Sequence, residues 1–75
     1  MNLTVDTSEY FRTHLHAPRC EAGYKQGLWI FFLGRSHGFG TEWIELSVTA
    51  SYSAAKRQAL HEAKRLGCNK INLSA

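Results

Sequence analysis

The chain has 75 residues, of which 44% are hydrophobic and 20% charged, a composition that fits one globular domain with a thin core and argues against disorder. Its longest apolar run, Leu28–Leu33, is too short to span a membrane, and its first residues lack the basic start and apolar stretch of a signal peptide. The net charge is +3. We therefore expect a single-domain soluble protein of the cytoplasm, with free thiols at Cys20 and Cys68.

The first third of the chain permits two interpretations. Leu3–Val5 is typical of a short strand. Residues 9–17 alternate in a way that favours a second strand, but they also fit a short helix that is capped by Thr7 or Ser8 and stops before Pro18. If residues 9–17 form a strand, we expect an α+β fold with an antiparallel sheet of about three to five strands packed on one main C-terminal helix. If these residues form a helix, we expect an antiparallel sheet with the element order β-α-β-β-α-β, as in ferredoxin-like domains.

Two further strands are expected to form an antiparallel hairpin. Leu28–Leu33 is apolar at every position, as in a strand covered on both faces. Trp43–Ala50 alternates between apolar and polar residues, which is typical of a half-buried strand. Gly34–Thr41 lies between them and contains three glycines, so it predicts a flexible connecting loop.

The clearest predicted element is a helix over Ser53–Leu66, which is rich in strong helix formers. Ser51 or Ser53 can cap its start, and Gly67 follows its end. The residues that share its apolar face are Tyr52, Ala55, Ala59, Leu60, Ala63 and Leu66. A short last strand is expected at Lys70–Ser74.

The opposite face of this helix predicts one candidate binding surface. Residues 53–75 contain five basic residues and one acidic residue, whereas residues 1–52 contain four basic and five acidic residues. The candidates are Arg57, His61, Lys64, Arg65 and, beyond the helix, Lys70. Such a row can contact the phosphates of a nucleic acid or an acidic protein surface. Alternatively, these residues bind no partner and only form the solvent-exposed face of the helix.

A second candidate surface is aromatic. If Ile30 and Phe32 face the helix, the alternation of the strands places three aromatic residues on the opposite face: Trp29, Phe31 and Trp43. Either the N-terminal segment covers them, or they form an exposed patch for a protein partner or for a second copy in a homodimer. The predicted loop adds Arg35 and His37 as possible contacts.

No motif predicts catalysis. The acidic residues are scattered, and the neighbouring positions of Ser36 and His37 do not establish the geometry of a catalytic triad. His14, His16 and Cys20 form one possible ligand cluster, whereas a zinc site usually combines two close ligand pairs. We therefore expect no enzyme, no catalytic residues, no metal and no cofactor.

The segment Ser53–Lys64 resembles the last helix of double-stranded-RNA-binding domains. In that family, lysines at the start of this helix meet phosphates, and a hairpin with a histidine in its loop precedes it. The resemblance covers about a third of the chain. Those domains start with a clear helix and end with this one, whereas a strand is expected to follow here.

The layout of Trp43–Ala50, Ser53–Leu66 and Lys70–Ser74 resembles the compact sheet-and-helix domains of small phage-encoded proteins, anti-CRISPR inhibitors among them. This resemblance is one of size and layout. It implies an inhibitor that binds a subunit or nucleic-acid channel of a bacterial defence complex in the host cytoplasm.

The sequence thus predicts a small non-enzymatic protein-binding module, with inhibition of a bacterial nucleoprotein complex implied by the resemblance. The alternative is direct nucleic-acid binding through the basic helix. A protein partner, a nucleic acid or a second copy of the chain fits this prediction, and a membrane does not.

Overall fold

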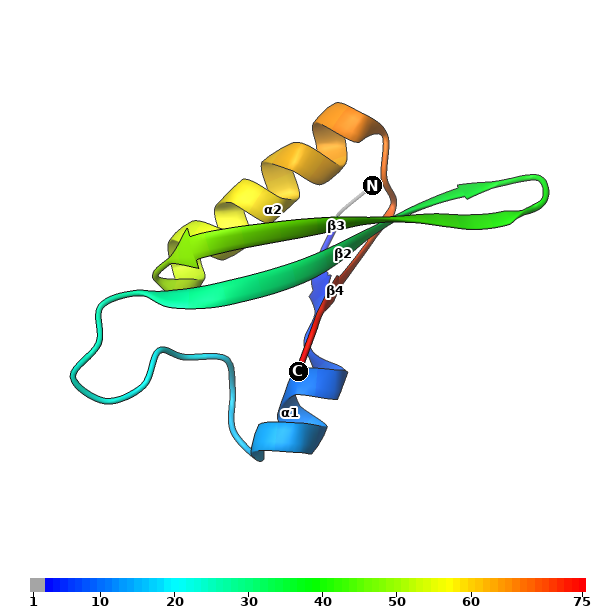
Figure 1. Ribbon diagram of the computed structural model, residues 1–75. Coiled ribbons are helices and arrows are strands. Elements are labelled where there is room, and N and C mark those ends of the chain that lie inside the picture. The colour runs from blue at the N-terminus through cyan, green and yellow to red at the C-terminus, as the bar shows by residue number, and fades with distance from the viewer. Residues whose placement is uncertain (1–2) are drawn as a thin grey trace.

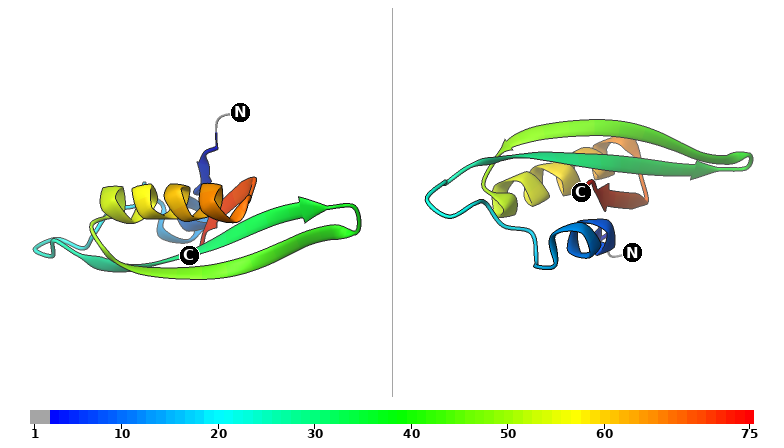
Figure 2. Two further views of the ribbon diagram at one scale, coloured as in Figure 1. Left: turned by 90° about the horizontal axis from the view of Figure 1, so that it is seen from above. Right: turned by 60° about the horizontal axis from the view of Figure 1, so that its bottom comes forward.

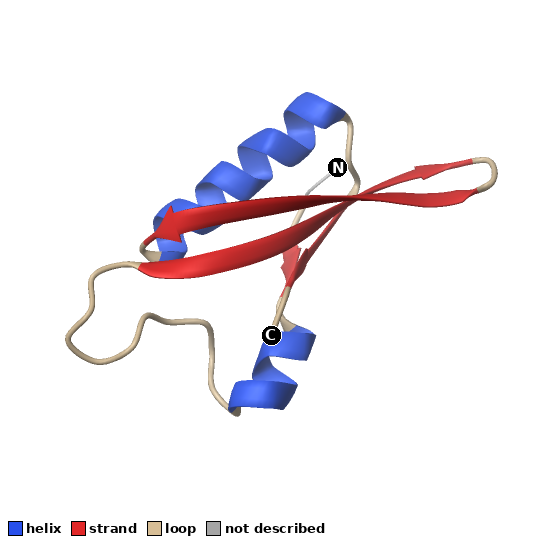
Figure 3. Ribbon diagram, in the orientation of Figure 1, coloured by secondary structure: helices blue, strands red, loops and turns tan. Residues whose placement is uncertain are grey.

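The computed structural model describes residues 3–75 and shows an α+β protein with a four-stranded sheet and two helices (Figure 1). The elements in chain order are β1 (Val5–Asp6), α1 (Ser8–His14), β2 (Gly27–His37), β3 (Gly40–Ala50), α2 (Tyr52–Leu66) and β4 (Lys70–Leu73). Figure 3 separates helices from strands by colour. Within the described residues, neither helix is both long and apolar enough to cross a membrane.

The sheet is mixed, which corrects the expectation of an antiparallel sheet. Its strand order is β1-β4-β2-β3. β2 pairs antiparallel with both β3 and β4, whereas β1 pairs parallel with β4. Residues 15–26 form a long connection from α1 to β2, and this connection lets β1 lie on the far side of β4. The element order is the alternative β-α-β-β-α-β, but the parallel edge pair departs from the antiparallel sheet expected with it.

The favoured strand over residues 9–17 is wrong, because α1 occupies most of this segment. Just before the helix, the Asp6 carboxylate accepts hydrogen bonds from the backbone N–H and the hydroxyl of Ser8. Tyr10 is buried, and its ring stacks on His14 one turn later, with ring centroids 4.2 Å apart. The alternation was misleading because Phe11 is exposed, so the apolar residues of this segment do not share one buried face.

The predicted hairpin is present, but its loop is much shorter than expected. β2 and β3 pair without interruption from Gly27 opposite Ala50 to His37 opposite Gly40. The turn therefore consists of Gly38 and Phe39, and most of the predicted loop is strand. Continued cross-strand pairing keeps these residues extended despite their glycines. Figure 1 shows this end of the hairpin projecting beyond the rest of the molecule.

The core lies between the sheet and α2. The Ser51 hydroxyl accepts a hydrogen bond from the Ala54 backbone N–H at 3.3 Å. Gly67 follows the last residue of the helix, and its φ of 73° favours glycine. Three small side chains face the sheet and are fully buried: Ala55, Ala59 and Ala63. They let α2 approach the strands closely. The largest fully buried side chains are Phe31, Leu33, Ile71 and Leu73.

Both helices lie on the same side of the sheet. The two views in Figure 2 show α1 and α2 on one side of the β2–β3 hairpin. The ring of Tyr10 in α1 also lies 5.8 Å from that of Trp29, a buried residue of the core. The other face of the sheet is therefore not covered by either helix.

Candidate protein-binding surface

Two residues of the predicted aromatic face are in fact buried on the side of the sheet that faces the helices. Trp29 is 5% exposed and Phe31 is fully buried. Trp29 lies opposite Val48, and its indole N–H donates to the Ala50 carbonyl at 3.0 Å. The prediction failed because Leu28–Leu33 is apolar at every position, so no polar residue within this run indicates which side chains point outward. Trp43, the third residue of that face, is 46% exposed, in line with the alternative of an exposed patch.

The uncovered face carries a different row of apolar side chains, which we call the open sheet face. It consists of Leu28, Ile30 and Phe32 of β2 and Trp43 of β3. Leu28 is 66% exposed, whereas Ile30 and Phe32 are half-buried. These residues alternate with the buried residues of the same strands, so they point away from both helices. The open sheet face combines apolar and aromatic groups on rigid strands.

Trp43 lies against the backbone of Gly34, the residue directly opposite it in the hairpin. A Cβ atom built on Gly34 would be 2.7 Å from Cζ3 of Trp43 and 3.0 Å from Cη2. The missing side chain therefore provides the space in which the indole ring packs against the strand. This support holds the ring in place on one side, while nearly half of the residue stays exposed. A supported and exposed tryptophan is typical of interface anchors.

Polar residues of both charges surround this apolar row. Glu45 lies opposite Phe32, and Lys70 lies opposite Gly34 on the other side of β2. Lys70 was expected to extend the basic row of the helix. However, Ile71 and Leu73 are buried on the helix side, so the alternation of β4 places Lys70 on the open sheet face.

The basic row of α2 lies on the opposite side of the molecule from the open sheet face. Arg57, His61 and Lys64 are exposed and point away from the sheet, since the buried alanines occupy the other side of the helix. Arg65 forms an ion pair with Glu62 at 2.8 Å, and this hydrogen bond lowers the pKa of Glu62. One flat partner surface therefore cannot contact both candidate surfaces.

Arg35 and His37 lie in the projecting part of the hairpin and not in a flexible loop. Arg35 forms an ion pair with Glu42 across the strands, with Nη2 and Oε2 2.6 Å apart. Nη1 of the same side chain donates to the carbonyl of Leu66 at the end of α2, at 3.5 Å. Nδ1 of His37 accepts from the backbone N–H of Phe39 at 3.4 Å. Arg35 thus connects the hairpin to α2, and its charge is already paired.

This ion pair predicts an altered titration of Glu42. The hydrogen bond from Arg35, followed by its positive charge, holds the pKa of Glu42 below its ordinary value. The pair therefore favours the folded state above the ordinary pKa of glutamate, and this contribution is lost as the pH falls through the lowered pKa. We expect an NMR titration of the Glu42 carboxyl to shift toward its ordinary midpoint in the Arg35→Ala variant. An unchanged midpoint would contradict the ion pair.

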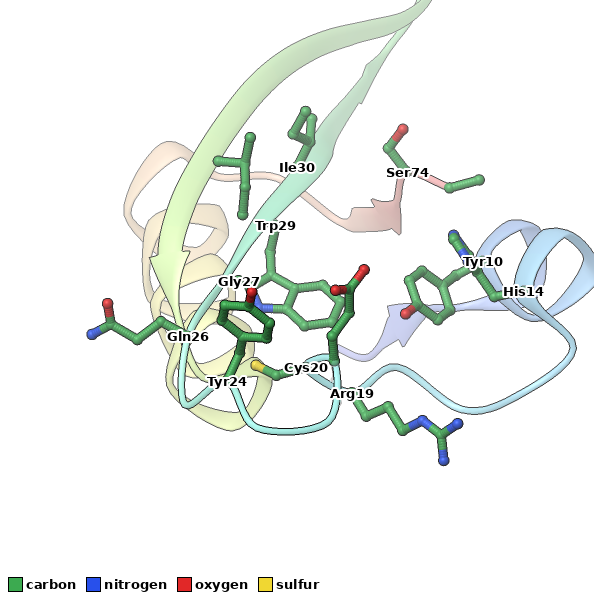
Figure 4. A pocket seen from close by; sticks show the side chains of 13 residues that line it. Tyr10, His14, Arg19, Cys20, Tyr24, Gln26, Gly27, Trp29, Ile30 and Ser74 are labelled. Carbon is green, nitrogen blue, oxygen red and sulfur yellow. The ribbon is translucent and has the colours of Figure 1, made fainter.

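A pocket that the sequence did not predict lies beside the first residues of β2. Its volume is about 360 Å³. Figure 4 shows Trp29 at its centre, with Tyr24 and Tyr10 on either side. Arg19 and Cys20, from the connection between α1 and β2, complete its wall. The length of this connection was the one available signal, because long loops often form binding sites.

The structure does not assemble His14, His16 and Cys20, the one cluster of possible ligands in the sequence, into a group that could hold a metal ion. The rings of His14 and His16 have centroids 5.8 Å apart. Across residues 3–75, no three His, Cys, Asp or Glu side chains are placed to hold a metal ion together.

No protein-family model matches the chain, and no curated protein or solved structure matches it significantly. A functional assignment therefore depends on the chemistry of the surfaces.

Proposed function

We propose that the protein is a small non-enzymatic module that binds a protein partner through the open sheet face. The observation that carries this proposal is the indole ring of Trp43, which is supported by Gly34, is nearly half exposed, and lies on the same face of the sheet as Leu28, Ile30 and Phe32. An aromatic anchor on a rigid strand loses little conformational entropy when it binds, so it contributes strongly to affinity.

The charges around this face favour a protein over a nucleic acid. On the open sheet face, β4 contributes one basic residue, Lys70. Two carboxylates, those of Glu45 and Asp6, lie on the same side of the sheet. Phosphates would be repelled by these carboxylates, and sheets that stack bases combine their aromatic residues with a basic groove. An apolar row with a rim of both charges suits a protein surface with an apolar ridge and complementary charges.

The resemblance to phage-encoded inhibitors extends this proposal to a subunit of a bacterial nucleoprotein complex. The resemblance in size and layout supports this extension, and so does the exposed basic row of α2 on the far side. When the open sheet face contacts such a subunit, this basic row remains free. Its field can then steer the protein toward a complex that carries the negative charge of nucleic acid.

A capture experiment with matched variants tests this proposal. The immobilised protein is exposed to bacterial lysate, and the retained proteins are identified by mass spectrometry. Trp43→Ala is expected to lose the specifically retained partner, with a loss in affinity of about tenfold or more. Arg57→Ala/Lys64→Ala is expected to retain it. Circular dichroism checks that both variants keep the fold. Equal retention by Trp43→Ala would contradict binding through the open sheet face.

Direct nucleic-acid binding is the second candidate, because Arg57 and Lys64 are exposed on one face of α2. Fluorescence anisotropy with short labelled DNA and RNA at about 50 and 200 mM salt separates the two candidates. Binding that weakens steeply with salt and is lost in Arg57→Ala/Lys64→Ala would support this second function. No binding at the lower salt concentration would leave the protein partner as the sole candidate of the two.

A further inference from the structure

β3 has a long free edge. It is the last strand in the order β1-β4-β2-β3, and its eleven residues pair with β2 without a bulge. It contains no proline, and no other strand among residues 3–75 pairs with its outer side. Natural edge strands are usually short, bulged, covered or interrupted by proline, because a free edge can pair with another chain. β3 is long and has neither a bulge nor a proline. Charged side chains can also protect an edge, and of the two in β3, Glu42 is paired with Arg35, which leaves Glu45.

The outward-facing backbone groups of β3 can be derived from the hydrogen bonds of β2. The carbonyls of Ile30 and Gly34 accept from backbone N–H groups of Ser74 and Asn69, so they point toward β4. The odd-numbered residues of β2 therefore exchange their hydrogen bonds with β3. Their partners in β3 are even-numbered, including Leu46 opposite Phe31. The N–H and C=O groups that point away from the sheet belong to Trp43, Glu45, Ser47 and Thr49.

We propose that the protein forms a homodimer in which β3 pairs antiparallel with β3 of a second copy, with Leu46 on the two-fold axis. In this register Leu46 lies opposite Leu46 of the second copy, Ile44 opposite Val48, and Glu45 opposite Ser47. The two four-stranded sheets then join into one sheet of eight strands. This arrangement does not depend on the partner proposed above, and it leaves the open sheet faces of both copies on the same side.

The side chains of β3 complement themselves in this register. On the helix side, Ile44 and Leu46 are half-buried and Val48 is buried, so the three form an apolar row at the edge of the core. Pairing two such rows buries the part that remains exposed. On the open side, each Glu45 carboxylate faces a Ser47 hydroxyl that can donate a hydrogen bond to it. Because the axis is two-fold, the Ile44–Val48 pair and the Glu45–Ser47 pair each occur twice in the dimer.

A neighbouring register is less favourable. Moving the axis to Glu45 places the two Glu45 carboxylates directly opposite each other, and like charges in such a pair are destabilising. It also places Glu42 opposite Val48. The register centred on Leu46 avoids both contacts and still pairs residues 42–50 of each chain. The sequence of β3 therefore favours the axis at Leu46 over the axis at Glu45.

Sedimentation velocity over a range of concentrations tests the dimer. The wild-type protein is expected to sediment as a dimer at about 100 μM and to dissociate on dilution. Ser47→Pro removes an outward-facing N–H that β2 does not use, so it is expected to keep the fold and remain monomeric. Ser47→Ala keeps the N–H and is the matched control, expected to dimerise. A wild-type monomer at every concentration up to about 1 mM would overturn the proposal.

Two further variants keep the test decisive if Ser47→Pro fails to fold. Ser47→Glu places two carboxylates opposite each other across the interface and is expected to weaken association at least tenfold, and adding Glu45→Lys is expected to restore it. In the presence of oxidised glutathione, which is reduced in the exchange, Leu46→Cys is expected to form a disulfide across the axis, because opposed residues of a non-hydrogen-bonded pair have Cα atoms about 4.5 Å apart. Peptide mass spectrometry distinguishes this bond from bonds that involve Cys20 or Cys68. A dimer without this crosslink would overturn the proposed register.

Discussion

Replacing Phe31 with alanine is expected to lower the free energy of unfolding by about 3–5 kcal/mol. The side chain is fully buried between the sheet and α2, and the three alanines of α2 cannot move to fill the space that it would leave. A domain of this size has a total stability on the order of 5–10 kcal/mol. The variant is therefore expected to be largely destabilised, with its urea midpoint shifted strongly downward.

Phe32→Ala is the matched control for this prediction. Phe32 has the same chemistry and lies one position further along β2, but it is half-buried on the open sheet face. We expect its replacement to cost about 1 kcal/mol, because most of the core contacts remain. Urea unfolding followed by circular dichroism measures both variants. Equal costs, or a larger cost for Phe32→Ala, would contradict the orientation of β2.

Replacing Gly34 with alanine is expected to displace the ring of Trp43 and to destabilise the protein by about 1–3 kcal/mol. The added methyl group would lie within 3.1 Å of three carbon atoms of the ring, which is closer than van der Waals contact allows. The indole ring would have to leave its supported position. We therefore expect a shift in the emission of Trp43, together with weaker binding of any partner that the open sheet face holds.

A double-mutant cycle shows whether the clash with Trp43 is the cause. In the Trp43→Ala background the ring is absent, so Gly34→Ala is expected to cost nothing or to stabilise the strand slightly, since glycine is unfavourable in strand interiors. The same cost in both backgrounds would show that the destabilisation comes from elsewhere in the hairpin. Trp29 is present throughout and provides a constant fluorescence background.

Local patterns predicted the position of most elements. A helix over Ser53–Leu66 is predicted from its content of helix formers, a serine before it and a glycine after it. In the structure α2 extends over Tyr52–Leu66. The alternation of Trp43–Ala50 likewise lies within β3. These features are local because capping, helix propensity and alternation depend on residues that are close in the sequence.

The orientation of β2 and the position of β1 could not be predicted, because both depend on residues that are distant in the sequence. Every residue of Leu28–Leu33 is apolar, so the pairing with β3 and the packing of α2 decide which ones are buried. The candidate surface was therefore partly wrong: Trp43 is on it, whereas Trp29 and Phe31 are replaced by their neighbours Leu28, Ile30 and Phe32. The support of Trp43 by Gly34 depends on the register of the hairpin, which the sequence pattern does not show.

The position of β4 has a consequence for how the chain folds as it is synthesised. β4 lies between β1 and β2, so it joins the first strand to the hairpin. Residues 5–14 are made before the hairpin and α2, but β1 has no strand to pair with until residues 70–73 have left the ribosome. The hairpin and α2 can form earlier because their contacts are closer in sequence, whereas the parallel β1–β4 pair closes a loop of more than sixty residues. We therefore expect the N-terminal segment to dock last, and a nascent chain stalled before β4 to leave its first residues open to proteases.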